Sequence, residues 1–218
     1  FLDIGSGSGL MSLAARRLGA TVRSFDFDPQ SVACTLELRR RYFTDDPNWS
    51  VTSGSVLDDS FVSSLGEYDV VYSWGVLHHT GQMWKAITNA ARRVAPRGLL
   101  FIAIYNDQGM PSRYWRAVKK IYNSGRAGRA AMIALHTPNV FLARLIVRSL
   151  TGRRGAGRGM SLWYDMLDWL GGYPFEVAKP EDILDFVRPA GFELTKLTTC
   201  RGRYGCNEFV FRRAAGAS

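Results

Sequence analysis

The feature that most constrains the fold of this chain is an apolar strand that leads directly into a glycine-rich turn and then into a helix. Residues 1–4 read as the end of a buried strand, so we expect the chain to begin inside that strand. The turn, Asp3-Ile-Gly5-Ser-Gly7-Ser-Gly9, lets a ligand approach the backbone, and the following helix offers unpaired N–H groups. A tight turn without a ligand is the simpler alternative. The pattern predicts a ligand site at the end of the first strand.

An aspartate at the end of the second predicted strand favours a ligand that contains a ribose. The glycine spacing is G-x-G-x-G, and Leu10 stands where a dinucleotide fingerprint would place its third glycine. Asp26 ends the strand at residues 21–26, where its carboxylate can accept hydrogen bonds from both ribose hydroxyls. Asp26 or Asp28 could instead cap the helix that begins at Pro29. Of the two, Asp28 is the better cap and Asp26 the better ribose ligand.

Strand and helix patterns alternate through the first hundred residues. We expect strands at 1–4, 21–26, 51–54, 69–73 and 98–104, separated by helices that end near residue 18 or span 29–43, 58–65 and 82–94. A helix that starts at Pro180 precedes two β-rich segments, 192–200 and 207–213, and the short loop between these segments makes them antiparallel. This order predicts an α/β fold with a doubly wound, mostly parallel sheet and an antiparallel last strand.

Residues 105–178 interrupt this alternation and carry the excess positive charge. The net charge is +9, and the stretch from Gln108 to Tyr164 holds eleven of the 28 basic residues and none of the 19 acidic ones. We expect helices at 113–123, 140–150 and 163–172, with a flexible basic loop at 152–159. The predicted organisation is a ligand-binding domain at 1–104 and 179–213, a basic helical insertion or substrate cap at 105–178, and a tail at 214–218.

The charge of the insertion indicates an anionic partner, because a solvated surface normally mixes both signs. Its first predicted helix is amphipathic, with an apolar face of Tyr114, Val118 and Ile121 and a basic face of Arg113, Arg116 and Lys120. Basic amphipathic helices are typical of proteins that lie on membrane surfaces. A solvated cap over the active site and a phosphate site in the glycine–arginine loop are the alternatives.

Composition bears on where the protein works. No apolar run is long enough to span a bilayer, and the first residues lack the basic start and cleavage site of a signal peptide. Cys34, Cys200 and Cys206 have no C-x-x-C spacing and fit reduced thiols better than a disulfide framework or a zinc site. We expect a cytoplasmic protein without a bound metal, and peripheral contact with an anionic membrane is a further hypothesis.

Five motifs in order resemble those of the class I S-adenosylmethionine (AdoMet)-dependent methyltransferases. The glycine turn resembles their D-x-G-x-G-x-G motif. The other four are Phe25-Asp-Phe-Asp-Pro29 (V-D-x-S-P), Gly54-Ser-Val-Leu-Asp58 (G-D-a-x-D), Tyr68 to His79 (the fourth-strand motif) and Arg93 to Leu100 (L-K-P-G-G-x-L). The insertion is placed as in the ubiquinone-biosynthesis O-methyltransferases and related small-molecule enzymes. The resemblance implies a Rossmann-like, seven-stranded sheet of order 3-2-1-4-5-7-6.

The same resemblance implies which residues bind AdoMet. Gly5, Ser6 and Gly7 would lie against its methionine part, and Asp3 would reach the ammonium group directly or through water. Asp26 would hold the ribose hydroxyls.

The adenine and methyl ends have their own implied contacts. Phe27 would flank the adenine ring, and Ser55 and Val56 would meet its edge. Ser55 stands where the family often has aspartate, and a hydroxyl can also accept the bond from the adenine amino group. Ser73 and Trp74 would line the methionine and methyl end.

Two adjacent histidines, His78 and His79, follow the fourth predicted strand, where substrates meet the cofactor in this fold. Methyl transfer depends mainly on positioning, and a base is needed only when the acceptor atom carries a proton. A neutral imidazole suits that task, so His79 is the candidate catalytic residue. A structural role in packing is the alternative for either histidine.

The sequence therefore predicts an AdoMet-dependent methyltransferase that acts on an oxygen or nitrogen of a small or lipophilic molecule. One alternative is an RNA or tRNA methyltransferase whose insertion contacts phosphates. Another is a non-catalytic AdoMet-binding module. The chain has neither a D/N-P-P-Y/F tetrapeptide nor a Pro-Cys nucleophile, which disfavours methylation of nucleic-acid bases.

Overall fold

The computed structural model describes residues 1–142, 146, 149–150 and 162–216. The chain divides into two compact units. Unit 1 comprises Phe1–Asp107 and Val177–Ser218, and unit 2 comprises Gln108–Glu176.

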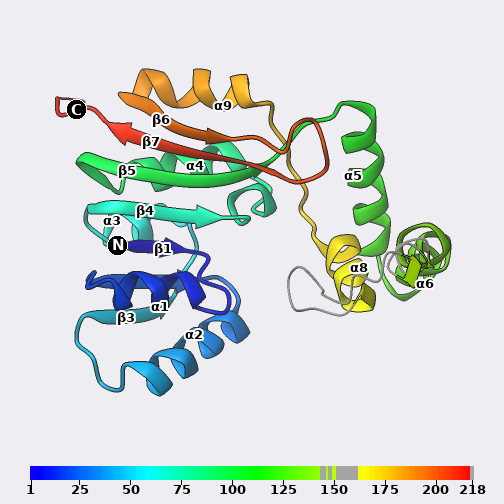
Figure 1. Ribbon diagram of the computed structural model, residues 1–218, viewed down its shortest axis with the longest axis horizontal. Coiled ribbons are helices and arrows are strands. Elements are labelled where there is room, and N and C mark those ends of the chain that lie inside the picture. Colours follow the sequence, from blue (N-terminus) through cyan, green and yellow to red (C-terminus); the bar gives the residue numbers. More distant parts are fainter. Residues whose placement is uncertain (143–145, 147–148, 151–161, 217–218) are drawn as a thin grey trace. The chain divides into compact units, whose positions relative to one another are not determined.

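Unit 1 is built on a seven-stranded sheet of order β3-β2-β1-β4-β5-β7-β6 (Figure 1). The strands are β1 Leu2–Ile4, β2 Val22–Asp26, β3 Trp49–Ser53, β4 Tyr68–Trp74, β5 Val94–Tyr105, β6 Phe192–Thr198 and β7 Cys206–Arg213. The first five pair in parallel, whereas β7 is antiparallel to both β5 and β6. The predicted fold class and strand order are thus confirmed. The order reverses between β1 and β4, which is the position where doubly wound sheets bind ligands.

Helices connect the strands of unit 1 and cover both faces of its sheet. They are α1 Leu10–Arg17, α2 Pro29–Tyr42, α3 Asp59–Ser63, η1 Leu77–His79, α4 Met83–Ala91, α9 Pro180–Val187 and η3 Arg188–Ala190. Ile87 of α4 and Ile183 of α9 belong to one buried cluster with the central strands. Leu13 of α1 packs with Val22 and Trp49 in a second cluster. Two separate clusters are what a sheet covered on both faces requires.

The boundary between α4 and β5 differs from the prediction. The sequence pattern extends the helix after β4 to Val94, but α4 ends at Ala91 and Val94 is the first residue of β5. Val94 is completely buried and pairs with Tyr68 of β4. Burial between strands outweighs the helical periodicity, and Pro96 two residues later cannot donate a helical hydrogen bond.

Unit 2 is helical over the residues that the structure describes. It contains α5 Met110–Tyr122, α6 Arg126–His136, a π-helical turn at Thr137–Leu142 and α8 Leu162–Gly171. Its own apolar cluster holds Val118 and Tyr122 of α5 with Met166 and Leu170 of α8. The predicted basic loop at 152–159, and residues 143–145 and 147–148 of the predicted helix at 140–150, lie outside the described residues. No described helix is both long and apolar enough to cross a membrane.

The buried face of α5 agrees only in part with the predicted one: Val118 is buried and Arg113, Arg116 and Lys120 are exposed, but three other residues differ. Tyr114 and Ile121 are 51% and 45% exposed, whereas Lys119 is only 1% exposed and lies on the packed side with Val118 and Tyr122. The buried ammonium group of this lysine packs over an aromatic ring. Its Nζ lies 4.3 Å from the centroid of the Trp169 ring. Hydropathy assigns a lysine to the exposed face of a helix, so a prediction based on hydropathy cannot identify a buried one.

Candidate active site

The glycine turn after β1 lies at the carboxyl edge of the sheet. Gly5, Gly7 and Gly9 all have positive φ, at 76°, 53° and 78°. A Cβ added to Gly5 would lie 2.5 Å from the side chain of Val76, and one added to Gly9 would lie 3.0 Å from Thr35. A Cβ added to Gly7 would meet nothing within 4 Å. The outer glycines are therefore demanded by packing, while the middle of the turn faces open space that a ligand could fill.

Thr35 of α2 fixes the turn from behind, and the sequence analysis did not identify it. Its Oγ1 lies 3.0 Å from the Oγ of Ser6 and donates a hydrogen bond to the carbonyl oxygen of Gly7 at 3.1 Å. Thr35 is completely buried in an otherwise largely exposed helix. In the sequence, only a polar residue at the buried position of α2 could have indicated this contact with the turn.

Asp3 is a buried carboxylate beneath the glycine turn. It is 2% exposed, and its Oδ2 accepts a hydrogen bond from the Ser12 hydroxyl at 2.5 Å. Burial raises the pKa of Asp3 from 3.8 to about 6, against the lowering effect of Ser12, and the charge of Asp26 raises it further. Such a group gains from an ammonium partner, because a cation would offset the cost of burying its charge.

A chain of donors points at Asp3. The Ser12 hydroxyl has one proton and donates it to Asp3, so the Ser24 hydroxyl must donate in the 2.6 Å contact between the two serines. The Trp49 indole N–H then donates to Ser24 at 2.9 Å. All four residues are buried, and every bond in the chain favours the ionised form of Asp3. Ser12, Ser24 and Trp49 come from α1, β2 and β3, so only the fold brings them together.

Asp26 and Asp28, two residues apart, have different contacts. Asp28 caps α2, because its carboxylate accepts the N–H groups of Gln30 and Ser31. Asp26 accepts the N–H of Gly7 through Oδ2 and that of Asp28 through Oδ1, each at 2.9 Å. Each oxygen keeps a further lone pair, so the carboxylate can still accept two hydroxyl groups.

The residues predicted to meet an adenine lie after β2 and β3. The Phe27 side chain is 80% exposed beside Asp26. The Oγ of Ser55 accepts the N–H of Leu57 at 3.2 Å, and the carbonyl oxygen of Val56 accepts the side-chain amide of Asn89 at 2.9 Å. Val56 itself is buried.

The end of β4 places Ser73 and Trp74 on opposite sides of the strand. Ser73 is completely buried, and its hydroxyl donates to the carbonyl oxygen of Ile4 at 3.0 Å, which ties β4 to β1. Trp74 is partly exposed, and its indole N–H donates to Glu208 of β7 at 2.9 Å. The Ser73 hydroxyl is therefore already used within the sheet.

His78 and His79 form an aromatic group with Tyr105 at the end of β5. The His78 ring is completely buried, with its centroid 4.0 Å from that of Tyr105 and 4.5 Å from that of His79. His79 is partly exposed, and its centroid lies 5.5 Å from that of Tyr105. His79 is thus the more accessible histidine. Tyr105 is a third aromatic residue here that the sequence analysis did not identify.

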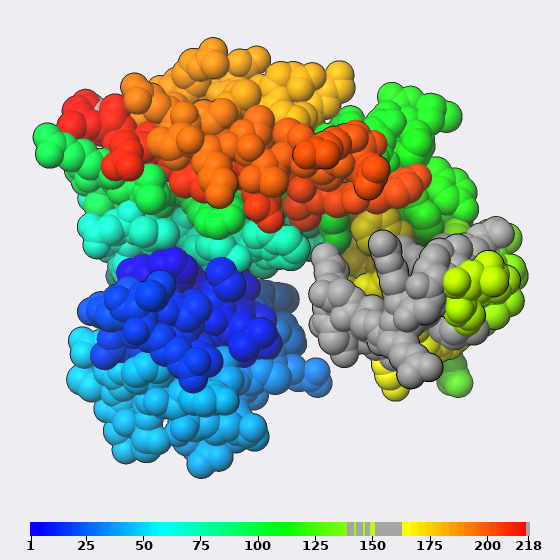
Figure 2. Space-filling view, in the orientation of Figure 1, coloured from blue at the N-terminus to red at the C-terminus, as the bar shows by residue number. Residues whose placement is uncertain are grey.

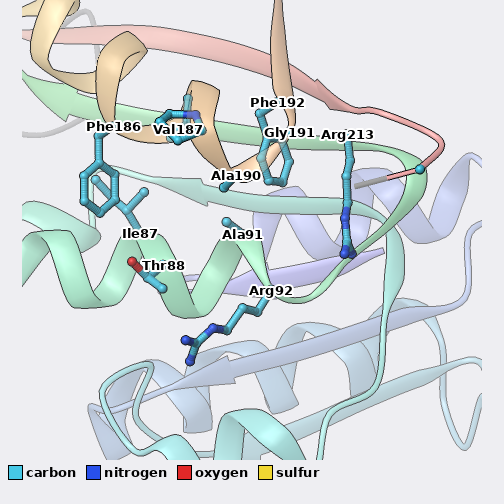
Figure 3. Close-up of a pocket in the computed structure, with 12 residues that line it drawn as sticks. Ile87, Thr88, Ala91, Arg92, Phe186, Val187, Ala190, Gly191, Phe192 and Arg213 are labelled. Atoms are coloured by element: carbon cyan, nitrogen blue, oxygen red, sulfur yellow. The ribbon is translucent and has the colours of Figure 1, made fainter. Parts of the chain in front are cut away.

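A pocket of about 550 Å³ in unit 1 lies away from these residues (Figure 3). Its lining includes Thr88 of α4, Arg92 directly after that helix, Phe186 of α9, and Arg213. Arg213 ends β7 and donates to the carbonyl oxygen of Val94, the first residue of β5. The pocket is therefore at the edge of the sheet where the parallel strands begin, and it contains none of the predicted site residues.

Comparisons with known sequences support the predictions for the first half of the chain. Residues 2–100 match a family model described as a methyltransferase domain. The ubiquinone biosynthesis O-methyltransferase of Agrobacterium fabrum is 30% identical over 105 residues, which cover 48% of this chain and 40% of that protein. The chain thus spans less than half the length of this curated relative.

Solved structures share the fold over nearly the whole chain. The magnesium protoporphyrin IX methyltransferase of Synechocystis, solved with bound S-adenosylhomocysteine, has a TM-score of 0.57 at 15% identity, covering 98% of this chain and 73% of that one. The [4+2]-cyclase SpnF has a TM-score of 0.61 at 13% identity, covering 99% of this chain and 74% of its own. At such identities the similarity shows the fold alone, and the second example shows that proteins of this fold do not all carry the name of a methyltransferase.

Proposed function

Because the chain carries a class I AdoMet-dependent methyltransferase domain, we propose that the whole protein transfers a methyl group from AdoMet to an oxygen or nitrogen of a small or lipophilic molecule. The observation that carries this proposal is the open face of Gly7 with two carboxylates beside it. Asp26 accepts the Gly7 N–H at 2.9 Å, and Asp3 is buried beneath the same turn. An open backbone between two acidic groups suits a ligand with an ammonium at one end and a ribose at the other.

The residues at this edge fit AdoMet in their donor and acceptor chemistry. Asp3 offers a buried carboxylate to the ammonium group, and Asp26 keeps lone pairs for two ribose hydroxyls. Gly5, Ser6 and Gly7 would contact the methionine part, as would the backbone at Ser73. Phe27, Ser55 and Val56 are assigned to adenine, and Trp74 to the methyl end.

The protein's part in the reaction is mainly to position the two reactants. AdoMet would supply a methyl group bonded to a sulfonium sulfur, and its demethylated thioether would be the leaving group. The glycine turn and Asp26 would hold the donor, and the end of β4 would align the acceptor. His79, partly exposed beside Tyr105, would take the proton of a hydroxyl or amine acceptor. His78 is completely buried and would support His79 by ring contact.

Binding and turnover test the proposal separately. Calorimetry of the full-length protein should show binding of AdoMet and of its demethylated product. Mass spectrometry of a cell extract incubated with the protein and isotope-labelled AdoMet should then identify a labelled small molecule. Binding of NAD without binding of AdoMet would overturn the assignment of the cofactor. Binding of AdoMet with no labelled product in metabolite or RNA pools would favour the non-catalytic module.

The RNA methyltransferase alternative is not favoured. The curated relative acts in ubiquinone biosynthesis by its name, and the chain has no tetrapeptide for methylation of bases. Label recovered in RNA, with an affinity for RNA that falls steeply with salt, would support the alternative.

We also propose that the protein works in the cytoplasm and that unit 2 makes peripheral contact with anionic membranes. Helices α5 and α6 contain five basic residues besides the buried Lys119 and no acidic one, and α5 exposes Met110, Tyr114 and Ile121. Each basic residue near an anionic surface contributes about 1 kcal/mol, and exposed apolar side chains add to this. Arg144, Arg148, Arg153, Arg154 and Arg158, which the sequence also assigns to this contact, lie outside the described residues.

Vesicle sedimentation tests this contact. The protein should co-sediment with phosphatidylglycerol vesicles and much less with phosphatidylcholine vesicles. Neutralising the five arginines together should abolish the binding and leave AdoMet affinity unchanged, because the proposed cofactor residues lie elsewhere in the chain. Equal sedimentation with both lipids would overturn the proposal. Loss of AdoMet affinity in the variant would assign the segment to the active site instead.

A further inference from the structure

A pocket opens in unit 1 between α4 and the segment that joins α9 to β6 (Figure 3). Its volume of about 550 Å³ lies within the range of small-molecule sites, roughly 300–1,000 Å³. All of the residues that line it belong to unit 1. The segment from α9 to β6 lies at the surface of that unit, in orange in Figure 2. The pocket can therefore admit a small molecule without a contribution from unit 2.

Apolar side chains form the floor of the pocket. Ile87 and Ala91 of α4 are buried on one side, and Val187 and Phe192 are buried on the other, as Figure 3 shows. All four belong to the main apolar cluster of unit 1. The small side chains of Ala91 and Ala190 leave the space between the two sides unfilled. An apolar group on a ligand would cover this floor, and its removal from water favours binding.

An exposed aromatic pair extends the apolar surface at one end of the pocket. Phe186 lines the pocket, and the centroid of its ring lies 4.7 Å from that of Trp84. Both side chains are exposed. Phe186 and Arg213 lie at opposite ends of the pocket in Figure 3. The lining is elongated, which suits an extended chain better than a compact ring.

Both charged residues that line the pocket are basic. Arg92 and Arg213 lie there, and the described lining contains no acidic residue. The Arg213 guanidinium donates to Glu67 at 3.0 Å and to the carbonyl oxygen of Val94, so it has a fixed place at one end. Glu67 offsets one of the two positive charges, and the pocket keeps a positive excess.

Arg92 has donors left for a ligand. Its side chain is exposed, and its charge acts on Asp59. The carboxylate of Asp59 already binds Lys85 and Asn89, each at 2.9 Å. A guanidinium carries five N–H donors, so Arg92 can still bind a carboxylate through two parallel hydrogen bonds.

We propose that this pocket binds a free carboxylate with an unbranched apolar chain, of the class of medium-chain fatty acids. The carboxylate pairs with Arg92 and is attracted by the charge of Arg213. The chain lies on the apolar floor and extends to the ring of Phe186. The pocket is at the edge of the sheet where the parallel strands begin, whereas the residues proposed to bind AdoMet are at the opposite edge. The protein therefore binds both ligands at once.

Calorimetry of the full-length protein with three probes separates the two parts of this ligand. Decanoate has both the charge and the chain, decanol has only the chain, and acetate has only the charge. Decanoate should bind, and decanol should bind roughly fivefold more weakly, because an ion pair that is partly open to solvent adds little. Acetate should show no measurable binding. Equal affinities for decanoate and decanol, or no binding of decanoate, would overturn the proposal.

Variants around α4 test the role of Arg92. Arg92→Gln should lower the affinity for decanoate to that for decanol and leave the affinity for decanol unchanged. Lys85→Gln, on the same side of unit 1 but outside the lining, is the matched control and should leave both affinities unchanged. Ala190→Trp, at an exposed position, should fill the pocket and weaken the binding of both probes. Equal losses in Arg92→Gln and Lys85→Gln, or full binding by Ala190→Trp, would contradict the proposal.

Photolabelling locates the bound chain without any variant. Decanoate that carries a diazirine at its far end should label residues 86–92 or 186–192, identified by fragmentation of tryptic peptides. Excess S-adenosylhomocysteine should not displace the label. Label on unit 2 would assign the binding to its basic helices, and displacement by S-adenosylhomocysteine would assign it to the AdoMet site. Either result overturns the proposal.

Discussion

At the scale of single residues, the contacts of two aspartates near the end of β2 show which one caps a helix and which one can bind a ligand. The carboxylate of Asp28 is used by the N-terminus of α2, whereas that of Asp26 is shared between Gly7 and its own turn. Both lie in one motif, and the sequence favours Asp28 as the cap and Asp26 as the ribose ligand. The structure distinguishes the two carboxylates, because only that of Asp26 accepts the N–H of Gly7.

The first prediction is that Asp26→Asn weakens AdoMet binding far more than Asp28→Ala does. Loss of a charged acceptor for the ribose hydroxyls should cost about 1.5–3 kcal/mol, or roughly ten- to hundredfold in affinity. Asp28→Ala removes a helix cap and should lower the free energy of unfolding by about 1 kcal/mol. Calorimetry and urea unfolding of both variants measure the two effects. Equal losses of affinity would contradict the assignment.

The second prediction concerns the proton on Asp3, whose pKa is raised to about 6 by burial. Between pH 3.8 and about 6 the folded state holds this proton and the unfolded chain releases it. The contribution of Asp3 to stability is therefore fully present below pH 3.8 and is lost as the pH rises through 6. An ammonium ligand has the opposite preference, because it pairs with the ionised carboxylate.

AdoMet affinity should consequently rise with pH through about 6, where Asp3 ionises. Binding isotherms at a series of pH values measure this, and Asp3→Asn should flatten the profile. A rise that persists in the Asp3→Asn variant would assign the titration to another group.

At the scale of elements, the donor chain from Trp49 to Asp3 joins β3, β2 and α1 beneath the turn. The third prediction is that Ser12→Ala moves the midpoint of the pH–affinity profile upward, because the hydrogen bond that lowers the pKa of Asp3 is lost. Ser60→Ala is a matched control on α3, where Ser60 donates to the exposed cap residue Asp58. An unchanged midpoint in Ser12→Ala would show that this bond does not set the charge of Asp3.

The elements that sequence predicts well are those whose pattern and surroundings agree. The strands of unit 1 alternate with helices at recognisable breaks, so their order follows from local signals. Helix α6 was not predicted, and Gly128 interrupts its helical pattern. A Cβ at Gly128 would lie 2.2 Å from the carbonyl oxygen of Ile121, so that glycine allows α6 to approach α5 closely. A requirement set by a neighbouring helix leaves no periodic signal.

The residues of the candidate site also fall into those that the sequence predicts and those that it does not. The glycine turn and Asp26 belong to contiguous motifs, and their proximity could be predicted. Thr35 and Ser24 reach the site from other elements through side-chain hydrogen bonds, so no local pattern marks them. The completely buried side chain of Ser73, which bonds to Ile4, likewise depends on the pairing of β4 with β1.

The fourth prediction concerns Lys119, which is buried among aromatic rings in unit 2. Burial lowers its pKa from 10.5 to about 8, against the opposing charge of Asp168. The unfolded chain binds more protons between these values, so the contribution of Lys119 to stability is fully present above pH 10.5 and is lost as the pH falls through 8.

Urea unfolding followed by tryptophan fluorescence measures this, because Trp169 lies against Lys119. The stability of unit 2 should rise with pH between 8 and 10.5, and Lys119→Met should remove this rise. Lys120→Met, at the exposed neighbouring position, is the matched control and should leave the rise intact. The same slope in both variants would contradict the assignment.

At the scale of the whole molecule, the two units have separate apolar clusters. Every member of the clusters around the sheet comes from unit 1, and every member of the third comes from unit 2. The chain leaves β5 and returns at one place. The N–H of Asp107 donates to the carbonyl oxygen of Ala178 at 3.1 Å, and the N–H of Ala178 donates to that of Tyr105 at 3.0 Å. Unit 2 is thus an insertion between Asp107 and Val177, and the residues of unit 1 that flank it are joined by hydrogen bonds.

The last prediction is that unit 1 folds and binds AdoMet after Gln108–Glu176 is replaced by roughly three glycines, each of which spans up to about 3.6 Å. AdoMet affinity should stay within a few-fold of the full chain, because the proposed cofactor residues and their supports all belong to unit 1. Calorimetry measures the affinity, and Asp26→Asn in the shortened chain should weaken it as in the full chain. Binding to anionic vesicles should disappear, since the basic helices α5 and α6 are removed. A shortened chain that folds but has lost AdoMet affinity would show that unit 2 supplies part of the cofactor site. Vesicle binding retained without unit 2 would place the membrane contact on the sheet domain.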